Sequence, residues 1–367
     1  MSGSKLFSPI KVGGLTLANR IVIAPMCQYS ATDGLMNDWH LQHLGMLAQS
    51  GAGAVTIEAT GVTAEGRISY ADVGLYNDDC EKAMGRVLEG VRRWSNTPIV
   101  IQLAHAGRKA SSNLPWKGGG QIHPDEKGGW YTVSASSEPV NAGDEQPMPL
   151  DEDAMERILN AFVNAARRAA RLGIDAIQIH GAHGYLLHQF LSPLTNKRRD
   201  EYGGSLENRM RFPLEVFSAV REVFPAERPV TFRVSATDWA PGGWNIEETV
   251  ALARQLEMRG CAAIHVSSGG LVPHQKIPIG PNYQVPFART VKASVHIPVV
   301  AVGLITEPEQ AEAIIATGEA DMVAIARAIL YDPRWPWHAA AKLGAQVHAA
   351  PQYLRCQPSL YKDLFIR

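Results

Sequence analysis

Three side chains that can hold or transfer a proton lie within six residues of one another, in the segment His180-Gly181-Ala182-His183-Gly184-Tyr185. This segment directly follows the apolar run 176–179, which has the composition of a buried parallel strand. In a barrel of parallel strands and helices, catalytic groups lie at the C-terminal ends of the strands. Two histidines three residues apart suit either a metal ion or two hydrogen bonds to one substrate oxygen, and the tyrosine could supply a proton.

The elements that must position this segment are indicated by short apolar runs that recur along the chain. The runs lack the in/out alternation of half-exposed strands, so each is expected to be covered on both faces. Between them lie helical patterns, the clearest starting after Asp151 and stopping at Gly173, and a second running from Asn245 to Gly260. Eight strands alternating with helices predict an α/β fold, a (β/α)8 TIM barrel, and no GxGxxG motif supports a doubly wound sheet instead. The eight runs are 21–25, 54–58, 99–103, 176–179, 230–234, 262–266, 298–302 and 322–325.

Three segments outside this repeat have their own expected roles. Residues 5–20 contain Gly13-Gly14 between short apolar stretches and predict an N-terminal hairpin that closes the bottom of the barrel. Residues 106–149, after the third strand, are rich in Gly, Pro and Ser and predict a lid-like insertion. We expect one domain over residues 1–367, ending in a tail over 350–367.

Composition narrows the classes of function. The 367 residues are 46% hydrophobic and carry a formal net charge of -1, so no attraction to nucleic acid or membrane is expected. The four cysteines stand singly, which argues against zinc and iron–sulfur sites and fits a reducing, cytoplasmic setting. The first residues lack an apolar signal region, and no stretch reaches the length of a membrane span.

Two further strand ends carry groups that suit an anionic ligand. Arg233 ends the fifth run; it could be a structural arginine paired with a carboxylate, or it could meet an electron-rich ring such as reduced flavin. Gly303 and Arg327 follow the seventh and eighth runs, where barrels of this kind usually bind phosphate.

Four strings together resemble the old yellow enzyme family of FMN-dependent ene-reductases, nearest to its thermophilic-like branch with the xenobiotic reductases. The resemblance extends over nearly the whole chain. Besides the segment 180–185, the strings are Ala24-Pro25-Met26-Cys27-Gln28-Tyr29, Gln102-Leu103-Ala104-His105-Ala106-Gly107-Arg108-Lys109, and Asn196-Lys197-Arg198-Arg199-Asp200-Glu201-Tyr202-Gly203-Gly204-Ser205.

This resemblance implies a tightly bound, non-covalent FMN across the barrel mouth, reduced by NADPH or NADH. Gln102 would bind the pyrimidine part of the ring, Arg233 would lie at flavin N1, and Cys27 would tune the flavin potential. Arg327 with Gly303 would hold the phosphate. The full set of implied FMN contacts is Ala24, Pro25, Met26, Cys27, Ala59, Gln102, Arg233, Gly303, Ala326 and Arg327.

The resemblance also implies small-molecule substrates, namely α,β-unsaturated carbonyl compounds and some nitro compounds. His180 and His183 would hold the carbonyl oxygen while flavin N5 delivers a hydride in a ping-pong cycle, and Tyr185 would donate the proton. Tyr29 would contact the substrate. Arg355, in the tail, would reach the active site of a neighbouring subunit in a homodimer or homotetramer.

Three alternatives to this interpretation have sequence requirements of their own. A metal-dependent barrel hydrolase built on His180 and His183 would need further ligands, for which only His105, Glu58 and Asp238 stand at strand ends. A larger dienoyl-CoA-reductase-type flavoprotein would need a cysteine cluster and a nucleotide domain. A non-catalytic flavin-binding protein would not depend on Tyr185. We therefore predict an FMN enzyme without a metal.

Overall fold

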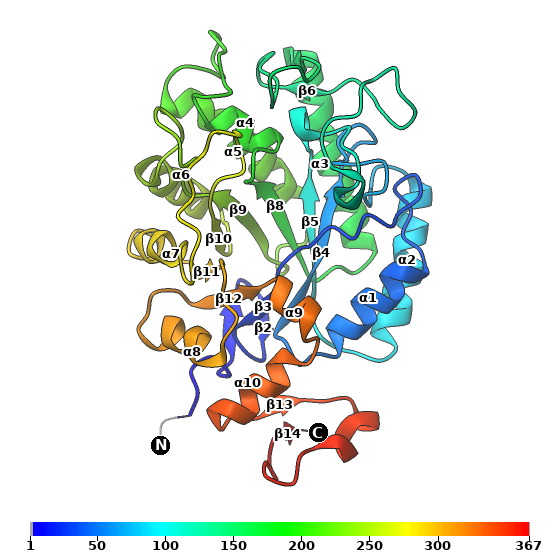
Figure 1. Cartoon of the computed structure of the whole chain (residues 1–367), viewed down its shortest axis with the longest axis vertical. Helices are drawn as coiled ribbons and strands as arrows, with labels where there is room; N and C mark the ends of the chain where they lie inside the picture. The colour runs from blue at the N-terminus through cyan, green and yellow to red at the C-terminus, as the bar shows by residue number, and fades with distance from the viewer. Residues whose placement is uncertain (1–2, 367) are drawn as a thin grey trace.

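The computed structural model describes residues 3–366, and its centre is a closed barrel of eight parallel strands (Figure 1). The strands follow one another around the barrel in chain order, and β12 pairs with β3 to close it. Each predicted apolar run contains one barrel strand, which confirms the predicted TIM barrel. The strands are β3 (Ile21–Ile23), β4 (Ala54–Gly61), β5 (Ile99–Ala104), β8 (Ala176–Gly181), β9 (Val230–Ser235), β10 (Ile264–Ser267), β11 (Val299–Ala301) and β12 (Met322–Ile325).

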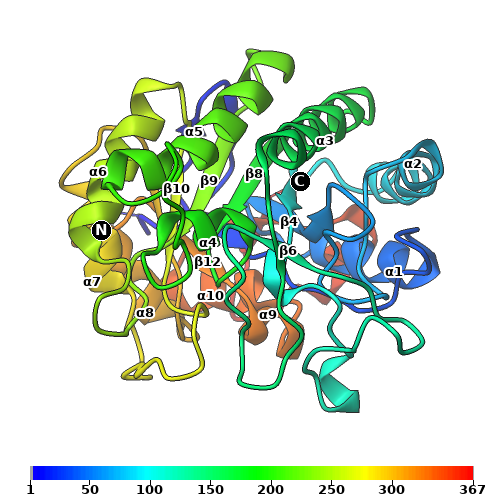
Figure 2. The same cartoon turned by 90° about the horizontal axis from the view of Figure 1, so that it is seen from above.

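Helices surround the strands, as the view from above shows (Figure 2). Both predicted helix starts are confirmed: the Asp151 side chain accepts a hydrogen bond from Ala154 N, and the Asn245 side chain accepts one from Glu248 N. No helix within residues 3–366 combines the length and apolar character needed to cross a membrane. The helices are α1 (Asp38–Ala48), α2 (Asp78–Arg92), α3 (Glu152–Arg171), α4 (Leu186–Leu191), α5 (Leu206–Val223), α6 (Ile246–Met258), α7 (Val285–Lys292), α8 (Pro308–Ala316), α9 (Arg327–Tyr331) and α10 (Trp335–Leu343).

The N-terminal hairpin closes one end of the barrel, as predicted. Strands β1 (Ile10–Val12) and β2 (Leu15–Leu17) pair antiparallel. The buried side chains of Val12 and Leu17 pack in a cluster with residues near the start of several barrel strands, among them Ala54 and Met322. This apolar plug leaves the opposite end, where the strands finish, for polar groups.

The insertion over 106–149 is largely irregular, as predicted, and polar contacts tie it to the barrel. It contains two short 3-10 turns (Gly107–Lys109 and Pro115–Lys117), and its β6 (Val133–Ser134) pairs with β7 (Met148–Pro149) at its end. The Arg108 guanidinium donates to the backbone oxygens of Glu138, Pro139 and Leu271. These bonds fix the insertion beside the loop after β10, and its function as a lid stays a prediction.

The C-terminal tail lies at the end of the molecule opposite to β6 (Figure 1). Its short strands β13 (Val347–His348) and β14 (Phe365–Ile366) pair with each other, and a 3-10 turn (Pro351–Cys356) lies between them. The Trp337 ring of α10 packs against the rings of Tyr353 and Phe365 in this tail. The tail is therefore a folded unit attached to α10.

Candidate active site

The two predicted histidines converge on one point at the end of β8. His180 Nε2 and His183 Nδ1 lie 3.4 Å apart. The other nitrogen of each ring is already engaged: His180 Nδ1 accepts from Ala182 N–H at 3.2 Å, and His183 Nε2 lies 2.7 Å from Ser267 Oγ. A Ser267 hydroxyl that donates to Nε2 leaves the His183 proton on Nδ1. Both facing nitrogens can then donate to an oxygen placed between them.

Both imidazoles are neutral at neutral pH. Burial lowers the pKa of His180 and of His183 well below the usual value, and the positive charge of Arg233 lowers both further. The register explains this influence, because His180 on β8 and His265 on β10 flank Arg233 on β9 in one layer of the barrel. Neutral imidazoles with fixed tautomers are hydrogen-bond donors rather than cations.

Tyr185 lies against this pair and begins α4. Its ring centroid is 4.8 Å from that of His180, with the planes 78° apart. Burial raises the pKa of Tyr185 well above its usual value, so the phenol keeps its proton. Lys109 Nζ lies 5.1 Å from the Tyr185 ring centroid and donates to the backbone oxygens of His183 and Gly270. Burial lowers the pKa of Lys109 to about 8.

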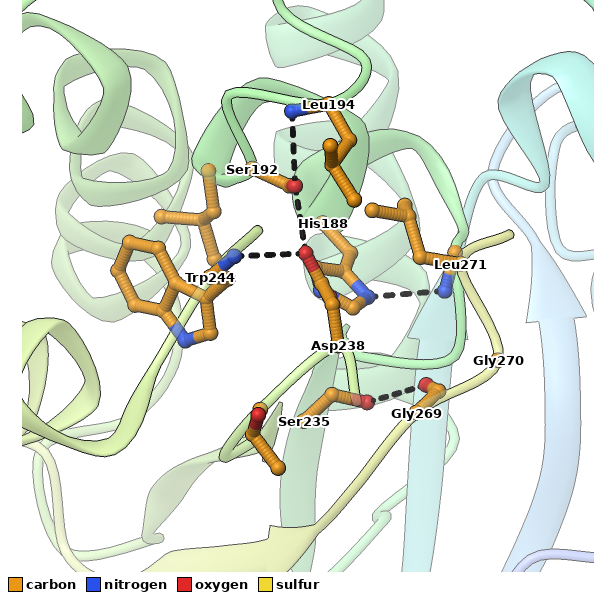
Figure 3. A network of polar contacts seen from close by, with 12 residues as sticks. His188, Ser192, Leu194, Ser235, Asp238, Trp244, Gly269, Gly270 and Leu271 are labelled. Carbon is orange, nitrogen blue, oxygen red and sulfur yellow. Dashed lines mark hydrogen bonds and ion pairs between the residues drawn. The ribbon is translucent and has the colours of Figure 1, made fainter. Parts of the chain in front are cut away.

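A second buried network holds the turn that carries these residues (Figure 3). His188 Nδ1 accepts a hydrogen bond from Gly184 N–H at 2.9 Å, and His188 Nε2 lies 2.8 Å from Asp238 Oδ1. Asp238 Oδ2 accepts from Ser192 Oγ at 2.6 Å and from Trp244 N–H at 2.7 Å. The network therefore fixes the residue between His183 and Tyr185.

Arg233 tests whether the barrel suits an anionic or electron-rich cofactor. Its side chain is buried, yet no ion pair or hydrogen bond to it is found within residues 3–366, and its Nε has no partner. The sequence alternative of a carboxylate-paired structural arginine is therefore wrong. Burial lowers the pKa of Arg233 to about 10, so it remains a cation. An unpaired buried guanidinium fits the electron-rich ring of FMN.

The predicted FMN contacts gather at the strand ends around Arg233. Ala59 and Gln102 are register partners on β4 and β5, and Gln102 Nε2 donates to Gln178 Oε1 at 2.7 Å. Gly303 has φ +123°, and a Cβ there would meet Gln284 Nε2 at 2.6 Å, so both conformation and space require glycine. Four contacts follow β3 without a break, and two adjoin the start of α9: Ala24, Pro25, Met26 and Cys27, and Ala326 and Arg327.

The predicted substrate contacts do not all lie together in one chain. Tyr29, with φ +52°, packs its ring edge-to-face against Trp116 of the insertion, with centroids 5.7 Å apart. The insertion thus reaches the residues after β3. Arg355 is exposed in the tail, which lies at the other end of the molecule from the insertion. The predicted role of Arg355 in a neighbouring subunit stays a prediction.

Sequence reasoning missed three kinds of supporting residue. Ser267 and the pair His188–Asp238 act on the histidine segment from other strands and helices, and only the fold brings them there. Lys109 belongs to the quoted string after the third strand, and its position in that string was the one available signal. By contrast, the 196–205 run has the predicted structural role: the Asn196 amide donates to Phe190 O and Tyr202 O.

The geometry gives no support to the metal-dependent hydrolase. Within residues 3–366, the one group of three potential metal ligands whose ligand atoms lie close together is Cys27, Glu58 and Asp72. Neither His180 nor His183 belongs to it, so the histidine pair lacks the further ligands that a catalytic zinc site uses.

Comparison with known proteins gives a consistent result. The model of the NADH:flavin oxidoreductase / NADH oxidase family matches residues 5–346. The chain is 43% identical over 352 residues to an NADPH dehydrogenase of Geobacillus sp. (strain WCH70), covering 95% of this chain and 98% of that protein. It is 43% identical over 369 residues to an NADH:flavin oxidoreductase of Gibberella zeae, covering 96% and 89%. The solved structure of morphinone reductase in complex with tetrahydroNAD is 28% identical, with a TM-score of 0.76 and coverage of 100% and 98%.

Proposed function

Because the chain belongs to the NADH:flavin oxidoreductase / NADH oxidase family, the old yellow enzyme family, it is an FMN-dependent oxidoreductase, and we propose that it uses NADPH to reduce the activated C=C bond of α,β-unsaturated carbonyl compounds. The proposal extends the family assignment to a substrate class and to named residues.

The observation that carries this proposal is the pair of facing nitrogens, His180 Nε2 and His183 Nδ1, 3.4 Å apart. A carbonyl oxygen between them would accept two hydrogen bonds. As negative charge grows on that oxygen during reduction, both bonds become stronger. Removing one such donor typically costs about 2.7–4 kcal/mol of transition-state stabilisation.

The remaining residues have complementary tasks. Bound FMN would supply the two-electron chemistry, taking a hydride from NADPH and giving one to the alkene. Arg233 would lie against the electron-rich part of the ring. The Tyr185 hydroxyl would then donate its proton to the substrate α-carbon, and the Lys109 cation, 5.1 Å from the ring centroid, would stabilise the phenolate left behind.

One cuvette experiment tests the reaction. The visible spectrum of the purified protein is recorded, NADPH is added without oxygen, and 2-cyclohexen-1-one follows. We expect flavin absorbance that bleaches with NADPH and returns with the enone. A protein that stays colourless after FMN is added would overturn the cofactor assignment. Bleaching without recovery would keep FMN and reject the enone as acceptor.

We further propose that the protein acts in the cytoplasm as a homodimer or homotetramer. Its four cysteines are unpaired, which fits a reducing compartment. Large apolar side chains are exposed on and beside α1 and α2, including Trp39, Met46 and Trp94, and a groove there is also lined by Tyr353 of the tail. Light scattering on full-length protein and on a chain ending before Pro351 tests the assembly, and an unchanged KM for the enone after truncation would reject the role of Arg355.

A further inference from the structure

A thiol and two buried carboxyl groups meet behind the residues that follow β3. Cys27 Sγ and carboxylate oxygens of Glu58 and Asp72 all lie within 4.8 Å of one another. Glu58 is 5% exposed and Asp72 is 0% exposed, whereas Cys27 is partly exposed. We call Glu58 and Asp72 the carboxylate pair.

The fold brings the carboxylate pair to the thiol by a local irregularity. The register between β4 and β5 shifts between Ile57 and Ala59, so Glu58 is the extra residue of a β-bulge. Such bulges redirect a side chain and are common beside active sites. Asp72 comes from the loop after β4, where one oxygen, Oδ2, accepts from Ser69 N–H at 2.6 Å and from Ser69 Oγ at 2.5 Å.

Hydrogen-bond donors around the carboxylate pair are few for two buried acids. Glu58 Oε2 accepts from Gln28 N–H at 2.9 Å, and Oε1 faces His40 Nε2 at 3.5 Å. Asp72 Oδ1 has no hydrogen-bond partner. Within residues 3–366, no arginine or lysine forms an ion pair with either acid. The negative charge of the pair is therefore poorly compensated, and it acts directly on the neighbouring sulfur.

The consequence for Cys27 follows from the chemistry of thiols. The thiolate, not the thiol, is the nucleophile. Burial raises the pKa of Cys27 well above its usual value, and the charges of Asp72 and Glu58 raise it further. The pKa of Glu58 and that of Asp72 are themselves raised by burial, so protons are retained throughout the cluster.

We propose that the carboxylate pair keeps Cys27 as a neutral thiol and thereby prevents electrophilic alkenes at the barrel mouth from being captured by its sulfur. The suppressed reaction is a conjugate addition. The sulfur lone pair of a thiolate forms an S–C bond to the β-carbon, the C=C electron pair moves to the carbonyl oxygen, and the α-carbon then takes a proton from water. The purpose of this device rests on the proposed function, because activated alkenes are the compounds that alkylate a thiolate.

Other charged and titratable groups act on the cluster from each side. Arg233, Tyr185 and Tyr29 lie close enough to Cys27 for its charge to influence the pKa of each. On the side of the acids, His40 faces Glu58, and the positive charge of Arg67 lowers the pKa of Asp72. Burial lowers the pKa of His40 to about 4, so it contributes no cation at neutral pH.

The test measures thiol alkylation in the FMN-loaded protein without NADPH, so that no alkene is reduced. N-ethylmaleimide is added between pH 6 and 10, and labelled peptides are quantified by mass spectrometry. The exposed Cys356 serves as an internal reference in the same molecule. We expect Cys27 to react at least about 100-fold more slowly than Cys356 at pH 7, since each pKa unit changes the thiolate fraction tenfold.

Two variants separate charge from steric shielding. Asp72→Asn and Glu58→Gln each remove one acid with little change in shape. Each should shift the midpoint of the Cys27 rate–pH profile down by about one unit or more and raise the rate at pH 7 by about threefold or more, because lower pKa also lowers intrinsic nucleophilicity. The matched control Glu65→Gln removes an exposed carboxylate from the same loop and should leave the profile unchanged.

Two results would overturn the proposal: wild-type Cys27 that reacts as fast as Cys356, or Cys27 rates that are unchanged in both folded variants. FMN content and thermal melting identify variants that fail to fold, and if one fails the other still decides. Because no NADPH is present, failure here is distinct from failure of enone reduction, which the bleaching experiment measures.

Discussion

Two buried acidic groups flank the same barrel mouth, and they differ in their supply of hydrogen-bond donors. On the β9 side, Asp238 receives three donors, from Ser192, Trp244 and His188. On the β4 side, Asp72 has an unpartnered oxygen and Glu58 faces a neutral imidazole at 3.5 Å. The pKa of Asp238 is lowered despite its burial, whereas the pKa of both acids of the carboxylate pair is raised.

The comparison shows that burial alone does not decide the charge of an acid. Burial favours the protonated form at both places, and hydrogen bonds to the charged form reverse that preference only for Asp238. A stable charge suits a group that holds a turn in place, as Asp238 does through His188. A retained proton suits a group beside a nucleophilic atom, as at Cys27.

The largest effect is expected from removing the donor-rich acid. Asp238→Ala would leave the His188 ring, the Ser192 hydroxyl and the Trp244 N–H buried without their acceptor. We expect a loss of about 3–5 kcal/mol in the free energy of unfolding, measured by urea denaturation. Asp238→Asn keeps an acceptor oxygen and should cost clearly less. A loss below about 1 kcal/mol for the alanine variant would show that the network holds little, and the contrast would fail.

The second prediction concerns Tyr185, which lies within reach of both regions. Its turn is held by the donor-rich network, and its pKa is raised in part by the charges of Cys27 and Asp72. Tyr185→Phe should slow enone reduction by about 100-fold or more, because it removes the proton donor, and should spare flavin reduction by NADPH. Stopped-flow measurement of the two half-reactions separates these steps.

The control for this prediction lies within the same experiment. The phenylalanine variant keeps the ring that packs against His180, so FMN binding should not change. Equal slowing of both half-reactions would mean that Tyr185 acts on the flavin or the turn rather than on the substrate proton.

How far the sequence predicts this molecule depends on the range of the interactions. The eight strands, the hairpin and the caps at Asp151 and Asn245 follow from local patterns, and all were predicted. The histidine–tyrosine segment was also predicted, since its members are neighbours in sequence. These features need no knowledge of which strands pair.

The supporting residues could not be predicted, because each acts across the fold. Glu58 and Asp238 were identified only as strand-end carboxylates for a metal, and the sequence does not distinguish their opposite environments. The bulge that redirects Glu58 depends on the pairing of β4 with β5. The partners of Asp238 come from α4 and from the loop after β9. Donor supply, which decides the charge state, is a tertiary property.

The smallest expected effect gives the sharpest comparison, because its sign differs between the two regions. The pKa of Glu58 is raised above its usual value of 4.5, so the folded protein retains a proton that the unfolded chain releases. Its stabilising contribution is therefore complete below pH 4.5 and is lost as pH rises. The pKa of Asp238 is lowered from 3.8, so its contribution is complete above that value and is lost as pH falls.

We therefore expect opposite slopes when each acid is replaced by its amide. The difference in unfolding free energy between wild type and Glu58→Gln should fall as pH rises above about 4.5, by at most about 1.4 kcal/mol per pH unit. The difference between wild type and Asp238→Asn should fall as pH drops below about 3.8. Using differences cancels the titration of distant groups that both proteins share. Urea denaturation from pH 3 to 8, followed by tryptophan fluorescence, measures both slopes, and slopes of the same sign would mean that donor supply does not separate these two acids.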